Sequence, residues 1–293
     1  MSTVDVVVVS YGSRATLRAC VEPLAGREGV SVFVVDNASP DAAHETVADL
    51  DVTVIAAGRN GGFSFGCNLG AAAGSGDHVL FLNPDAVLSP ADLDAMVDAL
   101  ERRPGVGVVG PRILGGDGAL LFSRRRLPRL RSTFAHALFL HRLLPRAGWA
   151  NEMVTDPAAY EQGGETGWLS GACLLVRRPA LDAIGGFDEG FFLYCEDTDL
   201  CLRLRRAGYG VHFEPGAVAR HQEGSSAPRS ELVAIHTRSR LRYARLHYRR
   251  PAAALEAAGI ALGALTHAAV AAPRRRAEAR GWLAALRVIP SAR

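Results

Sequence analysis

Two periodicities of hydrophobic residues alternate along the first 110 residues of this chain. Short apolar runs rich in β-branched residues are typical of buried strands, and they lie at residues 4–10, 30–35, 52–56, 78–82 and 106–109. Apolar residues recur with helical spacing at residues 13–24, 66–73 and 90–102. This alternation predicts an α/β fold with a Rossmann-like, mostly parallel central sheet and helices on both faces. A ligand site is expected at the carboxyl ends of the strands.

The pattern changes at residues 118–151. This stretch has no acidic residue, and leucines and phenylalanines are interleaved with seven arginines: Arg124, Arg125, Arg126, Arg129, Arg131, Arg142 and Arg146. It predicts a mobile segment that is both basic and apolar. Strands and helices return at residues 167–176, 179–184, 196–208 and 211–213, and the last strand leads to His221.

Charge is distributed unevenly along the sequence. Residues 1–219 hold 19 arginines against 26 acidic residues, whereas residues 220–293 hold 14 arginines against four. A basic tail of this kind indicates a phosphate-rich partner, either nucleic acid or an anionic membrane surface. The tail has no recognised nucleic-acid-binding motif, which favours the membrane. Its alanine-rich stretch, residues 252–272, is too weakly hydrophobic to predict a membrane span.

Composition excludes some kinds of chemistry. The 293 residues include no lysine, so all 33 basic residues are arginine. Schiff-base enzymes and Walker A phosphate loops are excluded, because both use an amine that arginine cannot supply. The five cysteines match no metal or redox spacing, which indicates a reducing, cytoplasmic compartment. Residues 1–10 lack a cationic leader, so we expect a first strand there and not a signal peptide.

Polar residues after the first two strands are candidates for nucleotide binding. Asp36 ends the second strand and could accept the imide N–H of a uracil or thymine base. The backbone of Ser10, Tyr11 and Gly12 could flank the same nucleotide. The alternative for Asp36 and Asn37 is a turn that caps a helix.

A glycine-rich stretch follows the third strand. Gly61 and its neighbouring glycine would let the backbone approach a ligand closely, and the amides of Asn60 and Asn68 could hold ribose or phosphate. Phe63 ends this stretch. Taken alone, the same residues are typical of an ordinary loop.

Two positions are candidates for a divalent cation. Asn83 and Asp85 flank a proline directly after the buried run at 78–82, and a carboxylate on such a stiff turn is suited to an ion that bridges a diphosphate. The alternative is an Asn-Pro turn. His221 is a second candidate ligand, although a lone histidine is more often a hydrogen-bonded core or surface residue.

The sharpest acidic cluster comprises Glu196, Asp197 and Asp199. These acids follow an aromatic run at 191–194 and begin a predicted helix, so they could simply complement its dipole. Carboxylates beside bulky apolar residues also acquire the raised pKa that suits a general base.

In their order and local sequences, these segments resemble the inverting glycosyltransferase family 2, which has the GT-A nucleotide-sugar fold. The resemblance covers residues 4–226. Its motifs are Val-Ser-Tyr-Gly-Ser at 9–13, Val-Asp-Asn-Ala-Ser at 35–39, Asn-Gly-Gly-Phe at 60–63 with Asn68, Leu-Asn-Pro-Asp at 82–85, Trp-Leu-Ser-Gly-Ala at 168–172, Gly-Gly-Phe-Asp-Glu at 185–189, Glu-Asp-Thr-Asp-Leu-Cys-Leu-Arg at 196–203, and His221 after Pro215.

The resemblance implies a role for each matched residue. Asp197 would be the catalytic base, and Asp85 with His221 would hold Mg²⁺ or Mn²⁺ on the donor diphosphate. The acceptor would lie against Glu196 and a wall formed by Trp168, Leu169, Ser170 and Gly171. The nucleotide-sugar would contact Ser10, Tyr11, Gly12, Asp36, Asn37, Asn60, Gly61, Phe63, Asn68, Asn83 and Asp85.

Within that family, the sequence is most similar to bacterial rhamnosyltransferases that act on polyprenyl-diphosphate-linked acceptors. In these enzymes Asn-Pro-Asp replaces the commoner Asp-x-Asp, which leaves Asp85 as the one carboxylate of the motif. The resemblance implies transfer of L-rhamnose from dTDP-β-L-rhamnose, with inversion to an α-L-rhamnoside, in cell-envelope or polysaccharide synthesis. The alternative within the family is a UDP- or GDP-sugar donor with a polysaccharide or natural-product acceptor.

Two further alternatives belong to other classes. A sugar nucleotidyltransferase has a similar core sheet, but it normally needs a glycine-rich loop with arginine and lysine after the first strand, and here residues 10–14 contain no lysine. A scaffold that binds anionic lipid would have no use for unpaired carboxylates in a cleft.

The expected organisation is a catalytic domain at residues 1–226 and a basic helical region at 227–293. Residues 1–110 would bind the nucleotide-sugar and residues 111–226 the acceptor. We expect peripheral association with the inner face of the cell membrane. If residues 231–250 are helical, four arginines share one face beside an apolar stripe of Leu232, Ile235, Tyr243 and Leu246; these are Arg238, Arg242, Arg245 and Arg249.

Overall fold

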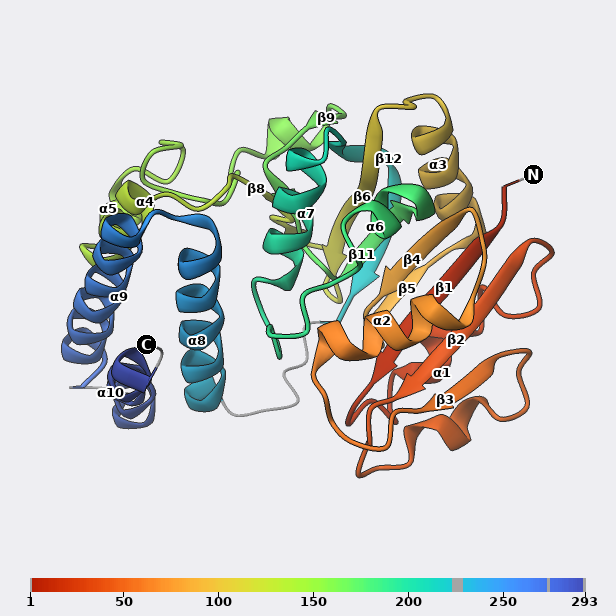
Figure 1. Ribbon diagram of the computed structural model, residues 1–293, viewed down its shortest axis with the longest axis horizontal. Helices are drawn as coiled ribbons and strands as arrows, with labels where there is room; N and C mark the ends of the chain where they lie inside the picture. The colour runs from red at the N-terminus through yellow and green to blue at the C-terminus, as the bar shows by residue number, and fades with distance from the viewer. Residues whose placement is uncertain (1, 223–228, 273–274, 292–293) are drawn as a thin grey trace.

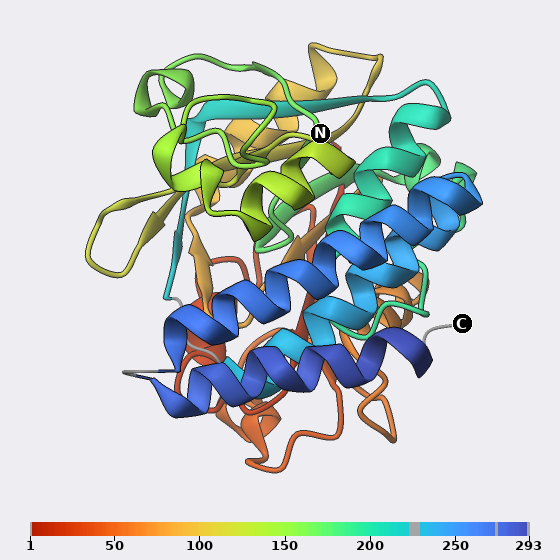
Figure 2. The ribbon, with the colours of Figure 1, turned by 90° about the vertical axis from the view of Figure 1, so that its left-hand side faces the viewer.

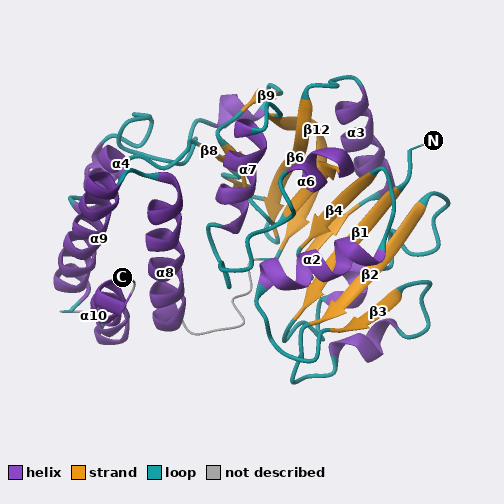
Figure 3. Cartoon of the chain, in the orientation of Figure 1, coloured by secondary structure: helices purple, strands orange, loops and turns teal. Residues whose placement is uncertain are grey.

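The centre of the molecule is a single mixed sheet. The computed structural model describes residues 2–222, 229–272 and 275–291. The main strands have the spatial order β3-β2-β1-β4-β11-β6-β12-β5 (Figures 1 and 3). Their bounds are β1 Val4–Ser10, β2 Val30–Asp36, β3 Thr53–Ala56, β4 His78–Leu82, β5 Ala86–Leu88, β6 Val106–Gly115, β11 Cys173–Arg177 and β12 Gly210–His221.

The first half of the sheet is parallel, as predicted. β1 pairs with β2 on one side and with β4 on the other, and every residue of β1 is buried. Because side chains alternate between the faces of a strand, Val6 and Val8 pack with helices α1 (Leu17–Val21) and α3 (Pro90–Glu101), whereas Val7 and Val9 pack with α2 (Phe63–Ala73) and α7 (Glu196–Arg206).

The second half departs from the predicted pattern in strand direction and length. β11 lies antiparallel between β4 and β6, and β12 runs parallel to β6 and antiparallel to β5. The single strand predicted at 167–176 is two strands, β10 (Trp168–Leu169) and β11, separated by a turn at Gly171 and Ala172. The short strand predicted at 211–213 is twelve residues long, with an irregularity in its pairing between Glu214 and Val218.

Shorter elements connect the sheet to the rest of the chain. They are η1 (Ala43–Val47), β7 (Leu120–Leu121), β8 (Arg124–Arg125), α4 (Leu130–Ala137), α5 (Leu140–Leu143), η2 (Pro157–Tyr160), β9 (Gly164–Glu165) and α6 (Arg178–Ala183). β8 and β10 form a separate antiparallel pair. The stretch predicted to be mobile, residues 118–151, therefore contains β7, β8, α4 and α5, and α4 packs against α9.

Three long helices form a layer beside the sheet (Figures 1 and 2). They are α8 (Arg229–His247), α9 (Arg250–Ala271) and α10 (Arg276–Ser291). α10 packs against both of the others, α8 lies nearest the sheet, and α9 and α10 form the outer side of the layer. Among the described residues, only α9 is long and apolar enough to cross a membrane, but a third of its apolar window is buried inside the fold.

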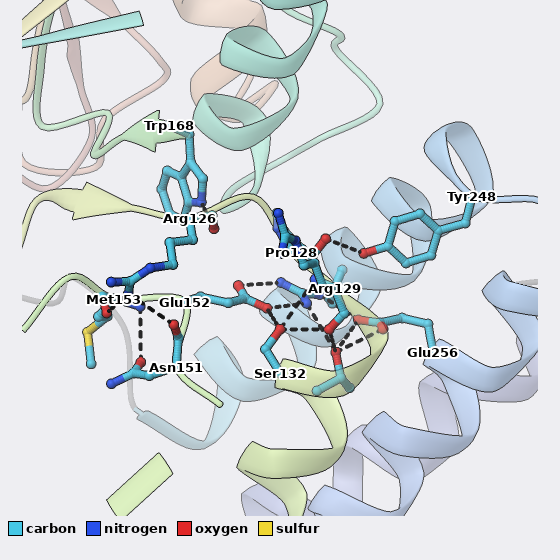
Figure 4. Close-up of polar contacts among 12 residues, drawn as sticks. Arg126, Pro128, Arg129, Ser132, Asn151, Glu152, Met153, Trp168, Tyr248 and Glu256 are labelled. Atoms are coloured by element: carbon cyan, nitrogen blue, oxygen red, sulfur yellow. Dashed lines mark hydrogen bonds and ion pairs between the residues drawn. The ribbon is translucent and has the colours of Figure 1, made fainter. Parts of the chain in front are cut away.

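A buried arginine joins the helical layer to α4. The Arg240 guanidinium lies between two carboxylates: its Nη2 is 2.6 Å from Glu152 Oε1 and its Nε is 2.7 Å from Glu256 Oε1. Ser132 and Thr133 of α4 donate hydrogen bonds to the same two carboxylates. Figure 4 shows this cluster between the ribbons of α4 and α9. The cluster fixes α4 to the helical layer.

Candidate functional site

The polar residues predicted to bind a nucleotide lie at the carboxyl ends of β1 and β2. Ser10 and Asp36 are partners in the register of these strands, and the buried Ser10 Oγ lies 2.8 Å from Ser13 Oγ. Gly12 has a φ of 64°, in the left-handed region that glycine tolerates, and its N–H donates to Ser39 Oγ. Tyr11 is exposed beside this turn.

Asp36 holds the turn that follows β2 and faces a histidine. Its Oδ1 accepts the backbone N–H of Ser39 at 2.9 Å, and its Oδ2 lies 3.3 Å from His44 Nδ1. Of the alternative interpretation, the turn is therefore present, but Asp36 does not cap a helix, since η1 begins at Ala43 with no side-chain cap. His44 was not identified from the sequence, because it comes from a later helical turn and has no motif of its own.

Asn37 and Asn60 form one hydrogen-bonded unit with the glycine-rich loop. Asn37 Nδ2 donates to Asn60 Oδ1, and Asn37 Oδ1 accepts the Gly61 N–H. Gly62 has a φ of 87°, and a Cβ placed there would lie 2.3 Å from the carbonyl oxygen of Phe192. The Phe63 N–H donates to that same oxygen at 2.8 Å. The loop of the nucleotide-binding half thus contacts the loop that precedes α7.

Asn68 has a connecting role in this structure. Its amide donates to the carbonyl of Phe187 and to Glu189 Oε1, and its Oδ1 accepts the Phe187 N–H. These bonds tie α2 to the loop at residues 185–189. The contacts of Asn68 are therefore with the fold, whereas the sequence predicted contacts with the nucleotide.

Asp85 and His221 meet as predicted, although they are 136 residues apart in sequence. Asp85 Oδ1 lies 3.0 Å from His221 Nε2, and Asn83 Nδ2 lies 3.4 Å from the same nitrogen. The pairing of β12 with β5 brings them together, because His221 is the register partner of Ala86. Both side chains are less than one-fifth exposed, so they are partly shielded but still reachable.

These residues suit a cation that takes its remaining ligands from a bound diphosphate. A carboxylate oxygen and an imidazole nitrogen at this separation could occupy neighbouring positions around one ion. Within the described part of the chain, no third histidine, cysteine or acidic residue joins them. Mg²⁺ commonly binds through one or two protein groups with phosphate and water completing its shell, so the residues present fit this kind of site.

Glu196 and Asp197 begin α7 and have different environments. Asp197 Oδ2 accepts the Gly171 N–H at 2.9 Å, and its Oδ1 accepts the Thr198 N–H at 2.7 Å. Burial raises the pKa of Asp197, while these hydrogen bonds and the Arg125 guanidinium oppose the rise. Glu196 is buried, and its Oε2 has no hydrogen-bond partner in the described chain. Burial, followed by the charge of Asp197, raises the pKa of Glu196 well above its ordinary value.

Hydrogen bonds connect the Asn-Pro-Asp turn to the acid pair. The Asn83 N–H donates to the carbonyl of Ala172, and the Gly171 N–H donates to Asp197. Two adjacent residues of the turn between β10 and β11 therefore link the Asn-Pro-Asp turn with Asp197. A Cβ at Gly171 would lie 3.4 Å from the Asp197 Cβ, so glycine keeps this approach uncrowded.

The predicted acceptor wall lies beside this turn. Trp168 donates its indole N–H to the Arg126 carbonyl, and the Arg125 guanidinium lies over its ring, 5.3 Å from the centroid. Leu169 is buried, and the Ser170 N–H donates to the carbonyl of Ser123. Arg125 was predicted only as part of a mobile basic stretch, but it belongs to the site.

Asp199, the third acid of the cluster, has a structural role. It is buried, with Oδ2 2.7 Å from Arg203 Nε and Oδ1 2.7 Å from His247 Nε2. His247 is the last residue of α8, so this contact joins α7 to the helical layer. No sequence motif indicated this contact, because the two residues lie 48 positions apart.

The backbone before the acid pair is strained. Tyr194 and Cys195 have φ values of 70° and 64°, a region that residues with a side chain rarely adopt. Strain of this kind persists only where the surroundings enforce it, and it often marks a functional site.

Comparisons with known proteins agree with this geometry. The model of glycosyl transferase family 2 matches residues 5–185, and the chain therefore belongs to that family. It is 35% identical over 249 residues to the N-acetylglucosaminyl-diphospho-decaprenol L-rhamnosyltransferase of Mycobacterium tuberculosis, covering 79% of this chain and 80% of that protein. It is 27% identical over 256 residues to rhamnosyltransferase WbbL of Escherichia coli, covering 82% of this chain and 92% of that protein.

Solved structures support the fold. A mannosyltransferase from Pyrobaculum calidifontis, in complex with GDP-Man and Mn²⁺, has a TM-score of 0.58 at 16% identity and covers 100% of this chain and 86% of its own. GalNAc-T7 with UDP, GalNAc and Mn²⁺ has a TM-score of 0.60 at 13% identity, covering 83% of this chain and 50% of its own. The chain is a glycosyltransferase with the GT-A fold and a C-terminal helical layer.

Proposed function

We propose that the protein transfers L-rhamnose from dTDP-L-rhamnose to a hydroxyl of a polyprenyl-diphosphate-linked glycan, with inversion at the anomeric carbon. The observation that carries this proposal is that hydrogen bonds link the Asn83–Asp85 turn, through residues 171–172, to Asp197, so that a diphosphate site at Asp85 and His221 would lie near the proposed base. Both relatives are named as rhamnosyltransferases, which supports L-rhamnose as the sugar. The decaprenol-linked substrate in the name of one of them supports a polyprenyl-linked acceptor.

In this mechanism Asp197 removes the proton from the acceptor hydroxyl. Hydrogen bonds from Gly171 and Thr198 fix the carboxylate, and its raised pKa makes it a better proton acceptor than an ordinary aspartate. The hydroxyl oxygen attacks the anomeric carbon as the bond to the nucleoside diphosphate breaks on the opposite side. Glu196, kept neutral by burial, can donate a hydrogen bond to the acceptor.

Asp85 and His221 would hold Mg²⁺ or Mn²⁺ on the donor diphosphate. When bound, the ion offsets the charge that develops on the leaving phosphate. Asp36 would accept the imide N–H of the thymine base, and His44 would limit the movement of the Asp36 carboxylate.

The second part of the proposal concerns location. An enzyme that acts on a polyprenyl-linked acceptor must meet it at a membrane, and the basic C-terminal region favours contact with anionic lipid. We therefore propose peripheral association with the inner face of the cell membrane.

The donor can be tested by thermal shift with dTDP-L-rhamnose, UDP-sugars and GDP-sugars in parallel. A ligand at 100 times its dissociation constant stabilises a protein by about 2.7 kcal/mol, so the correct donor should raise the melting temperature most. Transfer to a water-soluble diphosphate-linked acceptor analogue then tests the reaction. A UDP- or GDP-sugar that gives both the larger shift and the faster transfer would replace the proposed donor.

The base can be tested with Asp197→Asn. A positioned carboxylate base typically contributes about 10²–10⁴-fold to the rate, so transfer should fall by that factor while the donor dissociation constant stays within about twofold. Asp182→Asn, on the exposed side of α6, is the matched control. Transfer by Asp197→Asn within tenfold of the unaltered protein would contradict the assignment.

A further inference from the structure

The outer side of the helical layer carries exposed apolar side chains. Leu143 in α5 is 76% exposed and Val270 in α9 is 61% exposed. Leu138, Leu144 and Leu265 are also exposed, and these five residues together are named here the α5–α9 face. The stacking of Phe139 on His267, with ring centroids 4.3 Å apart, fixes the start of α5 against α9. Figure 2 shows α9 and α10 side by side across this side of the molecule.

One side of α9 is apolar along its whole length. From residue 252 to 271, every exposed position is apolar: Ala254, Leu255, Ala258, Leu265, Ala269 and Val270. The opposite side is buried, and there Glu256 binds Arg240. A membrane-spanning helix would have to break this ion pair or take it into the hydrocarbon core, which is costly. α9 is therefore suited to lie along a membrane surface and not to cross it.

Basic and aromatic residues surround a pocket at the edge of this face. The pocket has a volume of about 310 Å³ and lies between α5, α9 and α10. Phe139, His267 and Trp282 form its aromatic side, and the Arg142 guanidinium lies 4.7 Å from the Phe139 ring centroid. Arg275 also lines the pocket, 3.4 Å from Glu278, which is the one acidic residue among the described residues of the lining.

We propose that the α5–α9 face docks on an anionic phospholipid bilayer, with Arg142 and Arg275 binding lipid phosphates and Leu143 and Val270 entering the acyl boundary. Amphipathic surfaces bind bilayers by combining buried apolar area with attraction to anionic lipid, and this face supplies both. A second copy of the chain would bring arginines against arginines, which disfavours self-association. The proposal deepens the proposed membrane location and is independent of the donor.

This assignment differs from the arginine face that the sequence predicted on α8. Arg242 is bound to Asp188 of the catalytic domain, with Nη2 2.7 Å from Oδ1. Arg249 lies beyond the end of α8, because α8 ends at His247 and Arg249 caps the start of α9, where the helix direction changes. Tyr243, from the predicted apolar stripe, is buried with Phe191 and Cys195. α8 thus turns much of its surface inward.

Vesicle sedimentation of the full chain tests the proposal. Binding should require phosphatidylglycerol in phosphatidylcholine vesicles and should weaken as salt rises. Arg142→Gln with Arg275→Gln should lower the partition coefficient by roughly 25-fold, at about fivefold for each arginine near an anionic surface. Leu143→Gln with Val270→Gln should lower it by roughly tenfold or more, because both side chains would otherwise leave water.

Matched controls lie on the far side of the molecule. Arg102→Gln, at the C-cap of α3, and Val54→Gln, in β3, alter exposed residues of the same types and should leave vesicle binding unchanged. All of these variants should keep transfer to the water-soluble acceptor analogue. A protein that binds vesicles as expected but transfers no sugar would contradict the proposed function alone.

Three results would overturn the docking proposal. The first is equal binding to neutral vesicles or no binding to anionic ones. The second is binding that survives both double substitutions on the α5–α9 face but is lost in Arg238→Gln with Arg249→Gln, which would place the contact near α8. The third is that the protein stays in native membranes during alkaline carbonate extraction, which would indicate that α9 crosses the membrane.

Discussion

At the scale of single residues, the acid pair at the start of α7 contains one carboxyl group stabilised in its charged form and one that is not. Asp197 accepts three hydrogen bonds, two of them from backbone N–H groups, whereas Glu196 Oε2 has none within the described chain. Glu196 is therefore the member of the pair that holds a proton more strongly, which would leave Asp197 free to act as the proposed base. Two acids with different environments are a common way to separate the roles of donor and base.

The buried Glu196 should make stability depend on pH. Its pKa in the folded protein lies above the ordinary value of about 4.3, so the folded state binds the proton more tightly than the unfolded state. The contribution of Glu196 to the free energy of unfolding is then largest at low pH. It falls as pH rises through the window between the two pKa values, by about 1.4 kcal/mol for each unit of separation.

Glu196→Gln tests this, because an amide mimics the neutral acid. Between pH 5 and 8 the free energy of unfolding should decrease less steeply in this variant than in the unaltered protein. Glu28→Gln, in an exposed turn, should leave the slope unchanged. Identical slopes in all three proteins would mean that Glu196 is ionised in the fold.

Asp85 and His221 should differ in their contributions to nucleotide binding. Asp85→Ala removes a negatively charged ligand and should abolish the effect of Mg²⁺ or Mn²⁺ on the dissociation constant of the nucleoside diphosphate. His221→Ala removes a neutral ligand and should reduce that effect less. Calorimetric titration with and without metal measures both, with Asp182→Ala as control. An unchanged metal effect in both variants would show that any ion is held elsewhere.

How far the sequence could predict the site depends on how local each residue's partners are. Asp85, Asp197 and the 168–171 wall could be predicted as site residues because each lies in a short motif, and the structure places these motifs beside one another. His44 and Arg125 were missed as site residues because their partners come from distant segments. Asn68 lies in a motif too, but its contacts with Phe187 and Glu189 depend on a loop 119 residues later.

At the scale of elements, the strands of the first half followed from valine-rich runs such as 4–10, but strand direction did not. The alternation of side chains along a strand is the same in parallel and antiparallel sheets, so nothing in the sequence of β11 indicated that it enters antiparallel between β4 and β6. The length of β12 was missed because Pro215 and Gly216 interrupt its apolar pattern.

Helix α8 contacts and supports the loop that precedes Glu196 and Asp197. Ser239 Oγ donates to the Leu193 carbonyl at 2.7 Å, and the Arg242 guanidinium binds Asp188 and lies over the Phe191 ring. A Cβ at Gly190 would lie 2.0 Å from the Arg242 guanidinium carbon, so glycine is required for this contact. Tyr194 and Cys195, which have positive φ values, follow Leu193 directly. The contacts of α8 with this loop help to hold their backbone conformation.

Removing the contacts of Arg242 with this loop should slow sugar transfer more than it weakens donor binding. Arg242→Met loses the ion pair with Asp188, and a misplacement of about 1 Å at a catalytic group can cost about 10²-fold, so we expect kcat to fall by roughly 10- to 100-fold. The KM for the donor should change little, since the proposed nucleotide site lies at the carboxyl ends of β1 and β2. Arg238→Met, exposed on the same helix, is the control. A kcat within twofold of the unaltered protein would show that the loop holds its shape alone.

At the scale of the whole molecule, the charge asymmetry of the sequence indicated two arginine-rich regions but not how they meet. Residues 118–151 and 227–293 were predicted as separate parts, yet α4 and α9 pack together through the cluster around Arg240. No sequence pattern marks Glu152, Arg240 and Glu256 as partners, because they are separated by 88 and 16 residues. The proposed docking face depends on the position of α5 beside α9, to which this cluster contributes together with the stacking of Phe139 on His267.

Substitution of one charged residue of this cluster should therefore destabilise the protein strongly. Arg240→Met leaves two buried carboxylates without their cation, and breaking a buried ion pair in this way costs about 3–5 kcal/mol. Removing the charges together, as Arg240→Met with Glu152→Gln and Glu256→Gln, should restore much of that loss, since no unpaired charge remains. Denaturation and hydrogen exchange in α4 measure the two effects, with Arg238→Met as control. If Arg240→Met costs no more than that control, the helical layer is held by apolar packing alone, and the position of α5 does not depend on these charges.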